Sequence, residues 1–186
     1  MSSRAKQRVA PRVERQRRRR RTWVFRGMGI LAVLAVGIFA YRALTKEYPG
    51  RAVPTLGNQH IASVDTPHIP YNTRPPTSGP HLPYLAPWGI HDQPIPEELQ
   101  VHNLEDGGVL VQYDCHDCAE LIAKLKAIVS RYPDKVLLAP YPKMDTRIAL
   151  TAWGRIDAFD DFDEPRIVRF IEAYRGIDHH PRSGGF

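Results

Sequence analysis

An uncharged and mostly apolar run, Gly27–Tyr41, constrains this chain more than any other feature. Residues 23–25 extend the run if the intervening arginine reaches back to the lipid headgroups, which brings it close to the ~20 residues of a membrane-spanning helix. Trp23 and Tyr41 would then lie at the two interfaces, where aromatic side chains are enriched. A cleaved signal peptide is the alternative, but no small-x-small cleavage site follows the run. The pattern therefore predicts an uncleaved single-pass anchor over residues 22–44.

Charge is distributed unevenly on the two sides of this run. Residues 1–21 hold ten Lys/Arg and one acidic residue, whereas the chain from residue 45 onward holds fourteen Lys/Arg and nineteen Asp/Glu. The formal net charge of +6 therefore comes from the tail, and the body is mildly acidic. A duplex binder needs cations clustered on its contact face, so we expect no nucleic-acid partner for the body. Cationic flanks favour the cytoplasm, which predicts a cytoplasmic tail over residues 1–21 and an extracytoplasmic body at the cell membrane.

Composition and periodicity divide the rest of the chain. Residues 45–58 are punctuated by Pro and Gly and are predicted as a linker, and residues 177–186 as a flexible tail. Residues 59–176 between them are predicted to form the extracytoplasmic domain. Its first part, as far as about Pro96, is proline-rich and irregular.

The second part of this domain has regular patterns. Val109–Val111 predict a strand, and the apolar residues at helical spacing in AELIAKLKAIVSRY predict a helix. KVLLAPY and IALTAWGRI are predicted as two further strands, the second closed by Gly154, and DEPRIVRFIEAYRG as an amphipathic helix with Asp163 as its N-cap. The order strand, helix, strand, strand, helix predicts a small two-layer α+β or α/β domain, in which helices and strands bury one another's apolar faces.

The sharpest local feature is YDCHDCAEL, which places Cys115 and Cys118 at the start of the first predicted helix. A helix N-terminus lowers the pKa of a thiol, His116 would stabilise the thiolate further, and this layout is that of a thioredoxin-like redox site. However, no proline begins IALTAW, where that fold places a cis-proline, and one strand is lacking unless RIDAF forms a hairpin arm. An extracytoplasmic location favours an oxidised pair. A structural disulfide, a redox-active pair and a pair of metal ligands all stay open.

Histidines are concentrated in the proline-rich part of the domain and just after it: His60, His68, His81, His91 and His102. Two carboxylates, Glu105 and Asp106, follow the last of them. Imidazole together with carboxylate suits copper, zinc or iron. We therefore predict a transition-metal site, with copper or zinc as the metal, formed by His81, His102, Glu105 and Asp106. The spacing matches no standard metal motif, and hydrogen-bonding roles in loops are the alternative for each histidine.

Other polar residues are interpreted more simply. Glu97 and Glu98 are expected in a solvated turn, and VHNLEDGGVLVQYD is expected to be a turn that leads into a strand. Ser78 lacks the strand-turn-helix context of an esterase nucleophile. The acidic residues before the last helix are expected to cap it, because they lack the alternating oxygens and central glycine of a calcium loop.

Several long motifs resemble those of one bacterial family in the same order: YNTRPPTSGPH, APWGIHDQPIP, VHNLEDGGVLVQY, LLAPYPKMDTRIALTAWGRI and FDEPRIVRFIEAYRG. The family is DUF3105, whose members are membrane-anchored proteins of unknown function, and the resemblance runs from about His60 to Arg175. It implies that the proline-rich segment belongs to the domain, but it names no activity. Some members read HNLEHGG, so Asp106 replaces a histidine and changes the charge and softness of a metal site. The cysteine pair occurs in some members only, which argues against dithiol chemistry as the shared function.

The sequence as a whole predicts a single-pass, extracytoplasmic binding or accessory domain with no turnover of its own. Its ligand would be a metal ion, a small molecule or another protein, bound by loops on a rigid scaffold. The expected binding residues carry distinctive side chains in the motif-bearing loops: Tyr71, Asn72, His81, Trp88, His102 and Glu105. The alternative function is a thiol-disulfide oxidoreductase that uses Cys115 and Cys118.

Overall fold

The chain divides into two units, Met1–Glu47 and Tyr48–Phe186. The structure, a computed structural model, describes residues 23–29, 31–41, 48–115, 117–142 and 144–180. In the first unit, the helix Trp23–Tyr41 has 19 residues and a mean hydropathy of 2.0, so by length and composition it could cross a membrane. The predicted basic tail, residues 1–21, lies outside the described residues.

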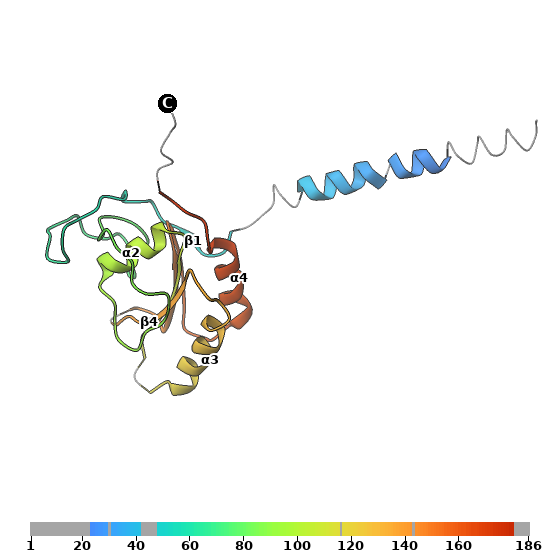
Figure 1. Ribbon diagram of the computed structural model, residues 1–186. Coiled ribbons are helices and arrows are strands. Elements are labelled where there is room, and N and C mark those ends of the chain that lie inside the picture. The colour runs from blue at the N-terminus through green and yellow to red at the C-terminus, as the bar shows by residue number, and fades with distance from the viewer. Residues whose placement is uncertain (1–22, 30, 42–47, 116, 143, 181–186) are drawn as a thin grey trace, which may run out of the picture. The chain divides into compact units, whose positions relative to one another are not determined.

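One six-stranded mixed sheet forms the centre of the second unit (Figure 1). Its strands lie in the order β1 (Arg51–Ala52), β6 (Arg155–Phe159), β5 (Ile148–Ala152), β3 (Val109–Tyr113), β4 (Val136–Pro140) and β2 (Gly89–Ile90). The strands β3, β4 and β2 are parallel, whereas β5, β6 and β1 pair antiparallel with their neighbours. All five residues of β3 are buried, as expected of an apolar strand at the centre of a covered sheet.

Two helices, α3 (Ala119–Val129) and α4 (Glu164–Tyr174), cover one face of the sheet (Figure 1). Their apolar stripes pack on Val109 and Val111 of β3, and Phe170 of α4 is completely buried. The predicted N-cap is confirmed, because Asp163 Oδ1 accepts a hydrogen bond of 3.0 Å from the backbone N–H of Arg166.

The opposite face is covered by α2 (Glu97–Glu105) and by the irregular segment before it. Leu104 of α2 packs with Leu110 and Leu137, which point away from α3 and α4. The predicted two-layer arrangement is therefore wrong. Successive residues of a strand point to opposite faces, and because β3 and β4 are apolar on both, both faces need cover.

Local patterns misjudged one element and left another open. The stretch from Glu97 to Glu105 is a helix rather than a turn, and it escaped prediction because no regular apolar stripe marks it. In IALTAWGRI the strand β5 ends before a turn at Trp153-Gly154, where Gly154 has φ +66°, so the prediction that Gly154 closes this strand is confirmed, and the turn joins β5 to β6. The segment RIDAF forms β6, the second arm of a hairpin with β5, which the sequence left open.

Most of the predicted linker belongs to the folded unit. Arg51 and Ala52 pair with β6, and the backbone N–H of Val53 donates to the carbonyl of Gly154 at 2.9 Å. The linker prediction is therefore wrong for residues 48–58, and residues 45–47 lie outside the described range. A two-residue edge strand is too short to show a period-two pattern, which is why the sequence resembled a linker there.

Candidate metal centre

Four side chains from two irregular segments and one helix converge at the C-terminal end of α2. The side chains of His60, His81, His102 and Glu105 each offer one nitrogen or oxygen atom, and these atoms lie within 4.8 Å of one another. His102 and Glu105 are three residues apart in α2, so both point from one face of the helix. His81 and His60 come from chain segments that meet in an isolated parallel β-bridge.

The helix α2 places these ligands through the residues between them. Asn103 clamps the irregular segment, because its amide accepts from the backbone N–H of Ala86 and donates to the carbonyl of Ala86, both at 2.9 Å. Leu104 points into the apolar core beside Leu110. In the motif HNLE, the first and last residues therefore face the cluster, and the two between them hold the helix in place.

The imidazole of His81 is completely buried and fixed in orientation. Its Nδ1 lies 2.7 Å from the carbonyl oxygen of Gly79, which can only accept, so Nδ1 carries the proton. The other ring nitrogen, Nε2, is directed at Glu105 Oε2 at 2.9 Å. A histidine whose far nitrogen donates to a carbonyl is the usual arrangement of a metal-ligating imidazole.

The separation between His81 Nε2 and Glu105 Oε2 fits shared coordination of one ion. With bonds of about 2.0–2.1 Å, two ligands at a right angle lie about 2.9 Å apart, and at the tetrahedral angle about 3.4 Å. His60 Nε2 lies 4.0 Å from the same carboxylate oxygen, longer than either of these edges, so this partly exposed ring would have to move closer to share the ion. Because a neutral His81 has already used its proton on Gly79, either a second proton or a cation must lie between Nε2 and the carboxylate.

Glu105 and His102 also have atoms that are available to bind a metal ion. Glu105 is 1 % exposed, and its second oxygen, Oε1, accepts a hydrogen bond of 2.8 Å from the amide of Asn58, which leaves Oε2 for the cluster. His102 is 8 % exposed, and its buried Nδ1 has no hydrogen-bond partner among the described residues. Burial lowers the pKa of His102, and the nearby His81 lowers it further, so the neutral imidazole that can bind a metal is favoured.

A second group of donors adjoins the first and shares His102. It consists of His102, Asp106 and His180, whose ligand atoms also lie within 4.8 Å of one another. The rings of His60 and His180 are partly exposed, so the cluster has a buried side and a side that faces solvent. The hydrogen bond with Asp178 raises the pKa of His180.

The structure thus brings together three of the four predicted metal ligands, His81, His102 and Glu105, and places Asp106 in the adjoining group. His60 belonged to the set of histidines noted in the sequence. His180 was missed because it lies in the stretch predicted as a flexible tail, where only a pair of consecutive histidines marked it. Residues 177–180 lie against α2, because the backbone N–H of His179 donates to the carbonyl of Glu105 at 2.8 Å.

Three predicted binding residues lie outside both groups and have hydrogen-bonding or packing partners. Tyr71 donates from its hydroxyl to the carbonyl of Pro80 at 2.6 Å, and burial raises its pKa. Asn72 donates to the carbonyl of Pro54 at 2.7 Å. Trp88 packs over Gly108, where a Cβ atom would come within 2.7 Å of the indole ring. These contacts fix the irregular segment that carries His81.

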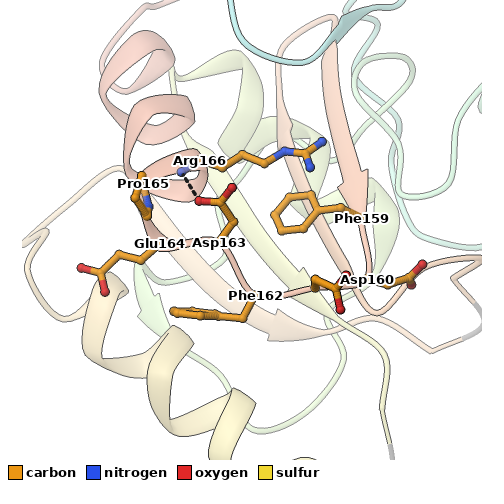
Figure 2. Close-up of a pocket in the computed structure, with 8 residues that line it drawn as sticks. Phe159, Asp160, Phe162, Asp163, Glu164, Pro165 and Arg166 are labelled. Atoms are coloured by element: carbon orange, nitrogen blue, oxygen red, sulfur yellow. Dashed lines mark hydrogen bonds between the residues drawn. The ribbon is translucent and has the colours of Figure 1, made fainter.

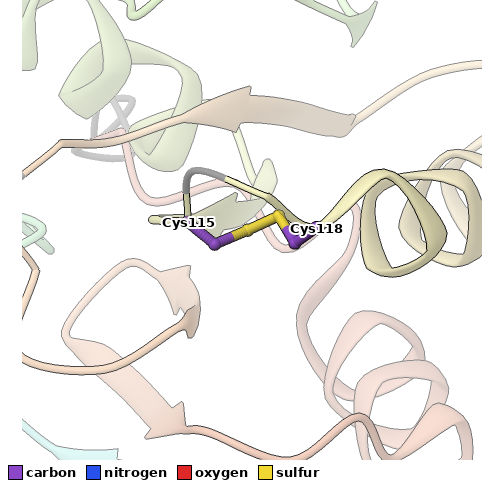
Figure 3. The surroundings of a disulfide bond; sticks show 2 residues. All are labelled: Cys115 and Cys118. Atoms are coloured by element: carbon purple, nitrogen blue, oxygen red, sulfur yellow. A yellow bond between two sulfur atoms is a disulfide. The ribbon is translucent and has the colours of Figure 1, made fainter.

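The cysteines do not meet the histidines. Cys115 and Cys118 form a disulfide at the start of α3 (Figure 3), and Cys118 is the N-cap residue of that helix. The strand β3 separates the two features, because α2 with its ligands precedes β3 and the disulfide follows it. Both sulfurs are used in the disulfide, and among the described residues neither donor group contains a cysteine. His116 lies outside the described range.

The acidic residues before α4 line a shallow pocket (Figure 2), but several of them have structural partners. Asp163 caps α4, and Asp160 Oδ1 accepts from the backbone N–H of Arg147 at 3.0 Å. Glu164 forms an ion pair of 2.7 Å with Arg131. The expected capping role therefore holds for Asp163, and a structural role accounts for the pocket's other paired carboxylates.

The fold and the cluster together define a mixed α+β domain with histidine and glutamate groups that could hold a metal ion. A family model described as "Protein of unknown function (DUF3105)" matches residues 63–185, more than half of the chain. The chain therefore belongs to the DUF3105 family, as the motifs predicted. Comparison with curated proteins and with solved structures finds no match.

Proposed function

We propose that this chain is a membrane-anchored domain that binds a transition-metal ion through His60, His81, His102 and Glu105. The observation that carries the proposal is the buried pair of His81 and Glu105, each held by a further hydrogen bond that leaves one ligand atom free for the cluster. A buried carboxylate among three imidazoles is costly without a cation. A metal ion would supply the missing positive charge.

The donor set favours Zn²⁺ or Cu²⁺. Imidazole nitrogen suits zinc, copper and iron, whereas a site for Cu(I) would be built from thiolate or thioether sulfur. One carboxylate and three histidines leave little of the oxygen-rich coordination that Mg²⁺ and Ca²⁺ require. The exposed side of the cluster leaves room for water or a ligand of the metal, as in zinc sites that keep an open position.

The membrane part of the proposal rests on the helix Trp23–Tyr41. Together with the basic residues 1–21, it supports a single-pass anchor with a cytoplasmic N-terminus and an extracytoplasmic domain. A metal site at that location would act as a binding or accessory module at the outer surface of the membrane.

Metal titration of the full-length protein tests the proposal. We expect the untagged chain in detergent micelles, stripped with EDTA, to bind Zn²⁺ or Cu²⁺ with a dissociation constant of about 1 μM or tighter, an affinity that corresponds to about −8 kcal/mol. The His91→Asn variant is the control, because His91 lies outside both groups and should bind as the unchanged protein does. Absence of binding by all of zinc, copper and iron would overturn the proposal.

We propose thiol-disulfide exchange by Cys115 and Cys118 as a second function. What supports this proposal is the order β3-α3-β4-β5-β6-α4, with the disulfide at the start of the first helix and both helices on one face of the sheet. The disulfide joins residues only three apart, and a short loop of this kind restricts the unfolded chain least, so a purely stabilising role is weak. The residue before β5 is Arg147, however, and not the proline typical of such sites.

Equilibration with glutathione redox buffers tests this second function. If the pair exchanges, two electrons from a substrate dithiol reduce the disulfide to two thiols, and the substrate becomes oxidised to a disulfide. We expect a reduction potential above about −300 mV, measured by thiol trapping. With dithiothreitol as the reductant, we also expect the reduced pair to pass two electrons to an insulin disulfide, and this catalysis should be lost in the double variant Cys115→Ser/Cys118→Ser. A potential below that value, or equal insulin reduction by the double variant, would show a structural disulfide instead.

A further inference from the structure

We propose that the cluster holds two metal ions, and that the second is bound by His102, Asp106 and His180. The first ion would then be bound by His60, His81 and Glu105. This inference rests on the proposed metal-binding function and extends it from one ion to two. It makes the C-terminal segment part of the site.

The backbone of the C-terminal segment is fixed beside the first site. The N–H of Gly176 donates to the carbonyl of Gly107 at 2.7 Å, and the N–H of His179 donates to the carbonyl of Glu105 at 2.8 Å. These two bonds hold residues 176–179 along the turn between α2 and β3. As a result His180 Nε2 lies 3.5 Å from Glu105 Oε2, and His180 Nδ1 lies 3.5 Å from Asp106 Oδ1.

The second set of donors also contains a buried group that needs a partner. Nδ1 of His102 is buried and has no hydrogen-bond partner in the part of the chain that the structure describes. The His102 ring lies among the other imidazoles, with its centroid 5.3 Å from that of His60, 5.1 Å from that of His81 and 6.0 Å from that of His180. It is therefore positioned between the two proposed ions.

The number of donors favours two ions over one. The two groups together offer six side chains, whereas zinc sites take three or four protein ligands. Glu105 Oε2 lies 2.9 Å from His81 Nε2 and 3.5 Å from His180 Nε2, so the carboxylate adjoins ligands of both ions and can bridge them. Paired ions in proteins are typically about 3.5–4 Å apart.

The charges around the second position are mixed but compatible with a cation. Asp106 supplies the negative charge, and Asp178 accepts a hydrogen bond of 2.7 Å from Nδ1 of His180, which leaves Nε2 of that ring for the metal. Lys135 is the opposing group, because its ammonium lies 3.9 Å from Asp106 Oδ2 and donates to the Asp106 carbonyl at 2.7 Å. Oδ1 of Asp106, which faces His180, is the carboxylate oxygen left for a metal. The partly exposed rings of His60 and His180 leave the remaining coordination positions to water or to an oxygen-donor ligand.

The stoichiometry of Zn²⁺ tests this inference. The full-length, untagged protein in micelles is loaded with Zn²⁺, freed of excess metal by gel filtration and analysed for metal per chain. We expect two ions per chain, and one in both the His180→Asn and Asp106→Asn variants. The His179→Asn variant should retain two, because His179 belongs to neither group of donors.

Each outcome separates the two proposals. No bound zinc, together with no bound copper or iron, would overturn the metal-binding function itself. One ion per unchanged chain would overturn only the second position, and two ions in His180→Asn would overturn its assignment to the C-terminal segment. Electron paramagnetic resonance of the Cu²⁺-loaded chain gives an independent readout, because two ions this close produce a dipole-coupled signal and a single ion does not. Circular dichroism of each variant shows whether it has folded.

Discussion

The Glu105→Gln variant is expected to lose metal binding while it keeps its fold. Glutamine has the shape of glutamate, so its oxygen can still accept from Asn58 and its amide can donate to Nε2 of His81. The variant therefore leaves both Asn58 and His81 with a hydrogen-bond partner at this position. It removes the single negative charge in the first group of donors, and with it the ligand atom that lies nearest to His81.

Substitution of a residue that only hydrogen-bonds to a metal ligand typically lowers metal affinity roughly 10–100-fold. Because Glu105 is itself a proposed ligand, we expect Glu105→Gln to lower the affinity by more than this. Isothermal titration with Zn²⁺ measures it, and thermal unfolding without metal shows that the fold is retained. The control is Glu98→Gln, the same substitution in the first turn of the same helix, where the carboxylate lies 3.5 Å from His68. If Glu105→Gln bound zinc as tightly as the control, the cluster would not be the metal site.

The second large effect is expected at Gly107, in the turn between α2 and β3. Its φ of +78° disfavours any residue with a Cβ atom, and that atom would lie 2.7 Å from the backbone of Ile177. The left-handed conformation costs roughly 1–2 kcal/mol for alanine, and inserting an atom into a packed position typically costs about 1–3 kcal/mol. We therefore expect Gly107→Ala to lower the free energy of unfolding by about 2–5 kcal/mol, measured by urea denaturation.

Gly176→Ala is the matched control for this change. Gly176 has a similar φ of +82°, but nothing lies within 4 Å of the Cβ position. It should therefore show the cost of the conformation alone, and the difference between the variants measures how tightly the C-terminal segment packs on the turn. Equal destabilisation would mean that residues 176–180 do not press against Gly107. The backbone hydrogen bond from Gly176 to Gly107 belongs to the same contact, which also helps to place His180 beside the cluster.

The elements with strong local signals were predicted well. The helices α3 and α4 have apolar stripes and, for α4, a capping aspartate, and these depend only on residues a few positions apart. The strands β3 and β4 are short apolar runs beside turn residues. In contrast, several side chains of α2 face the cluster or hydrogen-bond to the backbone of Ala86, and these positions are polar. They interrupt the apolar pattern, so periodicity did not indicate a helix.

The sequence predicted His81, His102 and Glu105 as members of the metal cluster, but not His60 or His180. A high density of histidines followed by Glu105 and Asp106 indicated metal chemistry, because few other combinations of side chains suit a transition metal. Tyr71, Asn72 and Trp88 seemed equally distinctive in the sequence. Their side chains instead fix the irregular segment by bonding or packing against backbone.

By itself, the sequence determined the apolar helix, the uneven charge, the strands and helices of the core and the family, because each depends on residues that are neighbours in the chain. Only the tertiary structure decided which donors meet. His60 and His81 are joined by a β-bridge, His102 and Glu105 share a helix face, and His180 is placed by backbone hydrogen bonds to the turn after α2. Contacts of this kind join residues as far apart in the chain as His102 and His180 and leave no periodic pattern, so only the folded protein shows that they form one cluster.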